Sequence, residues 1–189
     1  MRLASSHQPR EAGLMAPLFV LLGGWLLLRT AGRLGVEQLS SWRSAGRGAA
    51  AGTFMFTGAT HFSPMKRDYA AMIPKPLPRD LRLVYLTGLL QIAGAVALLI
   101  PPLRRAAGIG LATQLVAMFP ANVHAASEGI PFRGRPPTPL ALRAPVQLAF
   151  IAAVWWTAIA DGPRTDGSVR HRPIPGRPPR GRRGRLRQG

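Results

Sequence analysis

The chain alternates between long apolar stretches and short segments that carry most of its charge. Residues 83–100 contain no charged side chain, and a helix of this length spans about 27 Å, close to the roughly 30 Å of bilayer hydrocarbon. Residues 106–126 are equally free of Asp, Glu, Lys and Arg. A water-soluble domain of this size would rarely bury two such segments in succession. The pattern predicts an all-α integral membrane helical bundle, with apolar stretches at 14–28, 49–62, 83–100, 106–126 and 140–160.

Local sequence features predict how these helices are joined and packed. Gly48 and Gly52 in the second stretch have the small-residue spacing that lets two helices approach closely in lipid. Two prolines and two arginines within residues 101–105 predict a tight hairpin between the third and fourth stretches. The proline-rich segment at 63–82 has room for a short interfacial helix around Tyr69.

The same pattern divides the chain into three parts. Residues 1–44 hold an N-terminal transmembrane helix and a basic linker, and residues 45–160 hold a four-helix membrane core. The first helix is expected to stay uncleaved, because no small-x-small site directly follows its apolar run. Residues 161–189 are rich in Arg, Pro and Gly and are expected to be a disordered tail.

Charge predicts the orientation in the membrane. With five spans, the N-terminus and the 63–82 and 127–139 loops share one side, which together with Arg143 at the start of the last span holds 10 of the 25 Lys and Arg residues. The other side, with the 29–44 loop, Arg47, the hairpin and the tail, holds 15. The positive-inside rule then predicts a multi-pass protein of the cytoplasmic (inner) membrane with its C-terminus in the cytoplasm.

Composition narrows the chemistry. The chain has no cysteine, which excludes disulfides, thiolate catalysis and iron-sulfur ligation by this chain alone. Its net charge of +18 would suggest nucleic acid for a soluble protein. Here the arginine tail has no interleaved aromatic residues to stack bases, so we expect it to contact anionic lipid and no specific nucleic acid. The preference for Arg over Lys, with many Ala, Gly and Pro, suggests a GC-rich bacterial genome.

Five short strings, taken in order, resemble the DoxX family of small bacterial membrane proteins. The resemblance covers about residues 45–160 and implies a four-helix membrane core, to which the first helix and the tail are additions. It also implies a link to quinone chemistry, because family members are associated with quinol oxidase and thiosulfate:quinone oxidoreductase. Gln91 departs from the family, in which Glu often occupies this position, and a Gln side chain cannot transfer a proton. The strings are FTGATHF at 56–62, IPKPLP at 73–78, VYLTGLLQ at 84–91, FPANVHAA at 119–126 and RAPVQ at 143–147.

Polar residues within the apolar stretches are the candidate site. Gln91, Gln114 and Gln147 lie one on each of the last three stretches, and buried amides in lipid need partners. Thr57 and Thr87 are the other polar residues there, and we expect the amides to face the bundle interior and hydrogen-bond across helices. The alternative is a pocket for a quinone or another polar head group. The candidate residues for that pocket are His61, Gln91, Asn122, His124 and Gln147.

Two histidines near the ends of their helices suggest other roles. His124 and Glu128 stand four residues apart and, with His61, could form a site of two His and one carboxylate. Their spacing is not that of a helical metal motif, so we predict no metal site. We expect instead that Asn122 and His124 pair with each other near the helix end.

These observations leave several functions open. We favour a structural or accessory subunit of a membrane protein complex, with a redox link implied by the resemblance. The alternative is a quinone-interacting oxidoreductase subunit, for which a quinone is the implied cofactor. A small-solute carrier is weaker, because the chain lacks inverted repeats and a membrane-centred charge. No phosphate loop, GxSxG elbow, HExxH motif or dinucleotide fingerprint is present, so no catalytic residue can be named.

Overall fold

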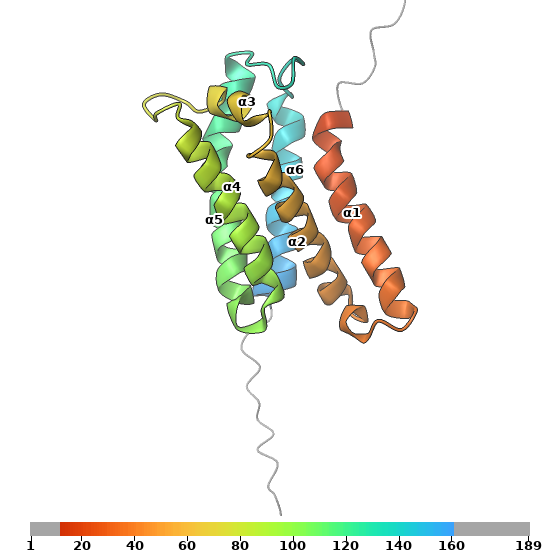
Figure 1. Ribbon diagram of the computed structural model, residues 1–189. Coiled ribbons are helices and arrows are strands. Elements are labelled where there is room, and N and C mark those ends of the chain that lie inside the picture. The colour runs from red at the N-terminus through yellow and green to blue at the C-terminus, as the bar shows by residue number, and fades with distance from the viewer. Residues whose placement is uncertain (1–11, 161–189) are drawn as a thin grey trace, which may run out of the picture.

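The computed structural model describes residues 12–160, and these residues form a bundle of long helices (Figure 1). The described part contains no strand; its one β-bridge joins Phe132 and Arg135. The predicted tail disorder lies outside the described residues. The elements are α1 (Ala12–Arg33), η1 (Glu37–Leu39), α2 (Trp42–Thr60), α3 (Lys66–Ala71), α4 (Leu81–Leu99), η2 (Pro101–Leu103), α5 (Arg104–Ser127), α6 (Leu140–Val154) and the π-helical turn η3 (Trp155–Ile159).

Three helical segments of the described part are long and apolar enough to cross a membrane. They are Leu81–Leu99, Pro101–Ser127 and Leu140–Ile159, with mean hydropathies of 1.7, 1.3 and 1.4. Most of each segment faces outward; large apolar side chains such as Leu89, Val116 and Leu148 are exposed. Lipid solvates such a surface, whereas water would not. These three segments agree with the prediction of an all-helical membrane protein.

The junction between α4 and α5 is the predicted tight hairpin. The backbone N–H of Leu103 bonds to the carbonyl of Ile100 (3.0 Å), which forms one 3₁₀ turn over Pro101 and Pro102. Because proline has no N–H, α4 cannot continue its hydrogen-bond ladder through this point. The chain therefore reverses within three residues and α5 packs along α4 (Figure 1).

The closest approach of α2 to α4 is made by a pair of glycines. An added Cβ on Gly58 would lie 3.0 Å from the carbonyl oxygen of Gly88, and one on Gly88 would lie 2.6 Å from Cβ of His61. The predicted close helix approach at Gly48 and Gly52 is confirmed for Gly48, against α1, and is wrong for Gly52. Gly52 is exposed with open space around it, and a Cβ on Gly48 would meet Leu28 of α1. Which glycines lie at the contact depends on how the helices are rotated and tilted against each other. The spacing of small residues along the sequence does not encode this.

Helix α1 is held against the start of α2 by aromatic and small residues. Leu21 is buried, and the indole N–H of Trp25 donates to the carbonyl of Trp42 (2.9 Å). Gly46 leaves room for the ring of Trp25, which a Cβ would meet at 2.7 Å. At the same end, Nε of Arg47 donates to the carbonyl of Thr157 (3.1 Å). That bond satisfies a carbonyl in the π-helical turn that ends the bundle.

Helix α3 lies across the opposite end of the bundle, on the start of α4. Ala70 and Ile73 are buried there together with Val84. The side chain of Asp80 caps α4 by accepting from the backbone N–H of Arg82 (3.0 Å). The start of α1, α3 and the 128–139 loop share this end, which is the grouping of segments that the sequence predicted (Figure 1).

The glycine contact gives a direct test of the helix packing. Replacing Gly88 by Ala inserts a methyl group where none fits, and overpacking costs about 1–3 kcal/mol. We expect Gly88→Ala to lower the midpoint of thermal unfolding, followed by tryptophan fluorescence in detergent. Gly52→Ala is the matched control, because its Cβ enters open space, and its midpoint should equal or exceed that of the wild type. Equal midpoints for the two variants would contradict this packing.

Candidate functional site

Amide side chains join the helices in the half of the bundle that includes α3. Oε1 of Gln91 accepts from the hydroxyl of Thr57 (3.2 Å), which links α4 to α2. Nε2 of Gln114 donates to the carbonyl of Thr87 (2.7 Å), which links α5 to α4. Nε2 of Gln91 also lies 3.7 Å from the sulfur of Met118. The prediction that these amides hydrogen-bond across helices is therefore confirmed for Gln91 and Gln114.

A second pair of amides links α5 to α6. Nδ2 of Asn122 donates to Oε1 of Gln147 (3.2 Å), and Nε2 of Gln147 donates to the carbonyl of Leu115 (2.8 Å). Both polar ends of Gln147 thus bond to α5. A hydrogen bond between membrane helices stabilises the bundle by about 0.6 kcal/mol on average.

His61 is buried at the end of α2 and stacks on Tyr69 of α3. Its Nδ1 lies 3.0 Å from the carbonyl of Thr57, and the two rings are parallel with centroids 4.3 Å apart. A nitrogen that faces a carbonyl must carry the proton, so Nδ1 is the donor and Nε2 is an acceptor in the neutral ring. Within residues 12–160, Nε2 has no hydrogen-bond partner.

His124 binds a side chain that the sequence did not suggest. Its Nε2 lies 3.1 Å from Nη2 of Arg79, and Nε of Arg79 donates to the carbonyl of Ile73. The predicted pairing of Asn122 with His124 is wrong, because Asn122 bonds to Gln147 instead. The two side chains are two positions apart on a helix and therefore point in different directions. In the part of the chain that the structure describes, no three His, Cys, Asp or Glu side chains gather as metal ligands.

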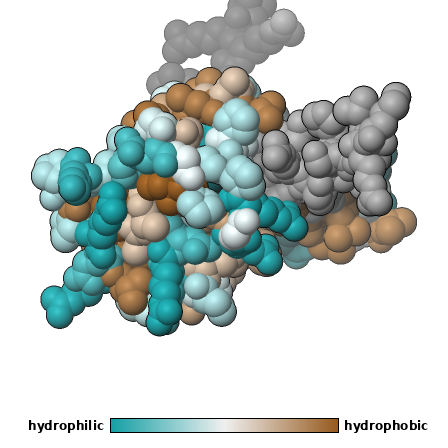
Figure 2. Space-filling model, turned by 90° about the horizontal axis from the view of Figure 1, so that it is seen from above, coloured by the Kyte–Doolittle hydropathy of each residue, from teal (hydrophilic) through white to brown (hydrophobic). Residues whose placement is uncertain are grey.

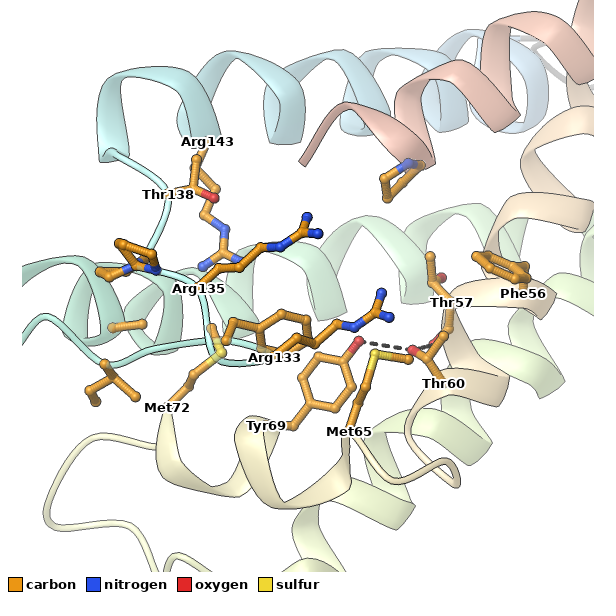
Figure 3. Close-up of a pocket in the computed structure, with 16 residues that line it drawn as sticks. Phe56, Thr57, Thr60, Met65, Tyr69, Met72, Arg133, Arg135, Thr138 and Arg143 are labelled. Carbon is orange, nitrogen blue, oxygen red and sulfur yellow. Dashed lines mark hydrogen bonds between the residues drawn. The ribbon is translucent and has the colours of Figure 1, made fainter. Parts of the chain in front are cut away.

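A pocket of about 300 Å³ opens at the α3 end of the bundle (Figure 3). Figure 2 looks onto this end and shows hydrophilic side chains gathered there, with apolar patches between them. The walls of the pocket come from α1, α2, α3, the end of α5, the loop that follows and the start of α6. The lining residues are Pro17, Phe56, Thr57, Thr60, Met65, Tyr69, Met72, Ala125, Ile130, Phe132, Arg133, Arg135, Pro136, Pro137, Thr138 and Arg143.

The polar part of this pocket is basic. Arg133, Arg135 and Arg143 line it, and no Asp or Glu is among the described residues that do so. The hydroxyls of Thr60 and Tyr69 lie 2.8 Å apart (Figure 3). Because the Thr60 hydroxyl donates to the carbonyl of Thr57, Tyr69 is the donor to Thr60. Burial raises the pKa of the Tyr69 hydroxyl above its usual value.

A two-residue turn places Arg133 and Arg135 at the pocket. Phe132 and Arg135 exchange backbone hydrogen bonds, and the two residues between them have positive φ, 53° for Arg133 and 70° for Gly134. Such turns favour Asn-Gly or Gly-Gly. The carboxylate of Asp68 accepts from the backbone N–H of Arg133 (3.0 Å), which ties the turn to α3.

The predicted quinone-site residues and this pocket are distinct sets. None of the five lines the pocket, and they lie in four groups: His61 on Tyr69, Gln91 on Thr57, Asn122 on Gln147, and His124 on Arg79. Thr57 connects two of the groups to the pocket, which it lines. Quinone binding by these residues stays a prediction. The sequence suggested no binding role for Arg133, Arg135 or Arg143. The Arg133-Gly134 pair in a short loop was the signal that could have predicted the turn.

The chain belongs to the family described as a domain of unknown function (DUF8561), whose family model matches residues 50–158. The matched region includes α2 from residue 50 onward, α3 and the 128–139 loop, and so covers every pocket residue except Pro17. No curated protein matches the chain, and no solved structure matches it either.

The raised pKa of Tyr69 predicts a dependence of stability on pH. At neutral pH, Tyr69→Phe loses one hydrogen bond, which should lower the free energy of unfolding by about 1 kcal/mol. Above pH 10 the tyrosine ionises more readily in the unfolded chain than in the folded one, so the wild type loses stability as pH rises to the folded pKa. The phenylalanine variant lacks this loss.

We therefore expect the stability gap between wild type and Tyr69→Phe to narrow from pH 8 to pH 11. Thermal unfolding followed by tryptophan fluorescence in buffered detergent measures it. A gap that stays constant or widens over this range would show that burial does not raise this pKa.

Proposed function

We propose that the chain is a small integral membrane protein of DoxX type that serves a partner complex of the bacterial cytoplasmic membrane as a structural or accessory subunit. Its core would be the four helices α2, α4, α5 and α6, with α1 as an added fifth span. The resemblance of residues 45–160 to the DoxX family is one support for this proposal.

The positions of the five DoxX-like strings agree with the proposal. They fall at the end of α2, in the segment after α3, in the first half of α4, in the second half of α5 and at the start of α6. These segments meet in one half of the bundle. The Thr57–Gln91 bond joins the first string to the third, and the Asn122–Gln147 bond joins the fourth to the fifth. If the five strings mark the core of a DoxX-type protein, their residues should lie close together in space, as these do.

The observation that best supports the accessory role is that the buried amides hydrogen-bond to neighbouring helices. Gln91, Gln114 and Gln147 each bond to another helix. Side chains committed in this way hold helices in register. The outward faces of α4, α5 and α6 are left apolar, which suits contact with lipid or with another membrane protein.

The proposed orientation follows from charge. We place the C-terminus in the cytoplasm and the α3 end of the bundle on the outer side. The arginine tail, outside the described residues, would contact anionic lipid on the cytoplasmic leaflet.

Photo-crosslinking from single lipid-facing positions tests the accessory role. A photoreactive residue at Leu89, Val116 or Leu148 samples the exposed faces of α4, α5 and α6, and one at the buried Leu98 is the matched control. We expect at least one exposed position to give one discrete protein adduct in native membranes, and Leu98 to give none. Adducts with lipid alone at all three exposed positions would contradict the proposal.

A second candidate function, a quinone-interacting oxidoreductase subunit, is favoured by one observation. Nε2 of His61 is a buried acceptor with no partner among residues 12–160, beside the Tyr69 ring that lines the pocket. A quinol hydroxyl could donate to such a nitrogen.

This candidate predicts that protein purified in mild detergent retains quinone, and that His61→Ala lowers the amount retained by the folded protein. His124→Ala is the comparison, because His124 already has a partner in Arg79. If His61→Ala alters stability alone, the quinone function fails and the accessory role stands.

A further inference from the structure

We propose that the pocket at the α3 end binds the phosphate group of an anionic membrane lipid, with Arg133, Arg135 and Arg143 as its ligands. We call this cavity the arginine pocket. The inference does not depend on the accessory role or on which leaflet the pocket faces.

Charge is the first reason. Three guanidinium groups share a space of about 300 Å³ that no described carboxylate lines. None of the three forms an ion pair with an acid of the described part, and the carboxylate of Asp68 accepts from the backbone N–H of Arg133 and not from its side chain. Arg133 and Arg135 are exposed and Arg143 is half-buried, so an anion can reach all three. Guanidinium groups match phosphate oxygens in both charge and geometry.

The arrangement of the side chains is the second reason. Figure 3 shows Arg133 and Arg135 extended into the pocket, with their guanidinium groups towards the side formed by Thr57 and Thr60. Arg143 enters from the start of α6 and is half-buried. Guanidinium donors from the loop after α5 and from the start of α6 therefore line one volume, as anion recognition needs.

The backbone of Arg133 is the third reason. An L-residue with φ of 53° is in a left-handed conformation that glycine adopts far more readily. A residue in this conformation persists only where the surroundings hold it, here through Asp68. The turn itself would favour glycine at this position, so we attribute the presence of arginine to a role of its side chain.

The apolar walls favour a lipid over a free anion. Phe56, Met65 and Met72 line the same pocket, and Phe56 is 56% exposed on the outside of α2. Pro17 of α1 completes that side. A volume of about 300 Å³ is at the lower end of ligand pockets, enough for a head group and too small for acyl chains. The chains would leave past Phe56 into the bilayer, and basic pockets between membrane helices recognise lipid head groups in this way.

Native mass spectrometry of the full chain in neutral detergent tests the proposal. The probes are phosphatidylglycerol, diacylglycerol with the same acyl chains, and inorganic phosphate. We expect phosphatidylglycerol to bind, diacylglycerol to bind at least about tenfold more weakly, and inorganic phosphate at the same concentration not to displace the lipid.

Arg133→Gly is the decisive variant, because it removes the guanidinium while giving the turn the residue that its φ favours. We expect about tenfold weaker phosphatidylglycerol binding with an unfolding midpoint equal to or above that of the wild type. Arg135→Gln should weaken binding similarly. Arg82→Gln is the matched control, since Arg82 lies at the same end, outside the pocket, with a 93% exposed side chain; its binding should stay within about twofold.

Three results would overturn the proposal. Unchanged phosphatidylglycerol binding by Arg133→Gly and Arg135→Gln would show that the arginines do not hold the lipid. Equal binding of diacylglycerol would show that the pocket selects acyl chains alone. Displacement of the lipid by inorganic phosphate at equal concentration would assign the pocket to a free anion.

Discussion

The structure depends on polar side chains finding their partners inside the bundle. No water is available in the hydrocarbon region, so an amide there must bond to protein. Gln91, Gln114 and Gln147 meet this requirement by bonding to neighbouring helices. The Gly58 and Gly88 contact lets α2 and α4 approach closely enough for the Thr57 bond to form. The glycine packing and the Thr57 hydrogen bond therefore both fix the position of α2 along α4.

The arginine pocket follows from that register. Thr57 bonds to Gln91 in the core and also lines the pocket, while Thr60, one turn later, holds the hydroxyl of Tyr69. Helix α3 is thus seated on α2, and Asp68 of α3 holds the turn that carries Arg133. The polar contacts that join the helices are continuous with those that shape the pocket. The core explains how a short loop can present charged side chains in a fixed place.

Sequence patterns predicted the features that depend on neighbours along the chain. The long apolar runs predicted α4, α5 and α6, and the prolines at 101 and 102 predicted the hairpin. The need of a buried amide for a partner predicted the cross-helix bonds of Gln91 and Gln147. The partner of His124 and the glycine contact depend on helix rotation, which hydropathy does not encode. The pocket unites side chains from Pro17 to Arg143, so it exists only once the helices are packed.

The most direct test of the central claim is the coupling energy between Asn122 and Gln147, measured by a double-mutant cycle of Asn122→Ala and Gln147→Ala in detergent. The cycle isolates their shared bond from the separate bond of Gln147 to Leu115. A bond between membrane helices predicts a coupling of about 0.6 to 1.7 kcal/mol in the free energy of unfolding. Additive effects of the two substitutions, with a coupling near zero, would contradict the claim that these amides hold α5 to α6.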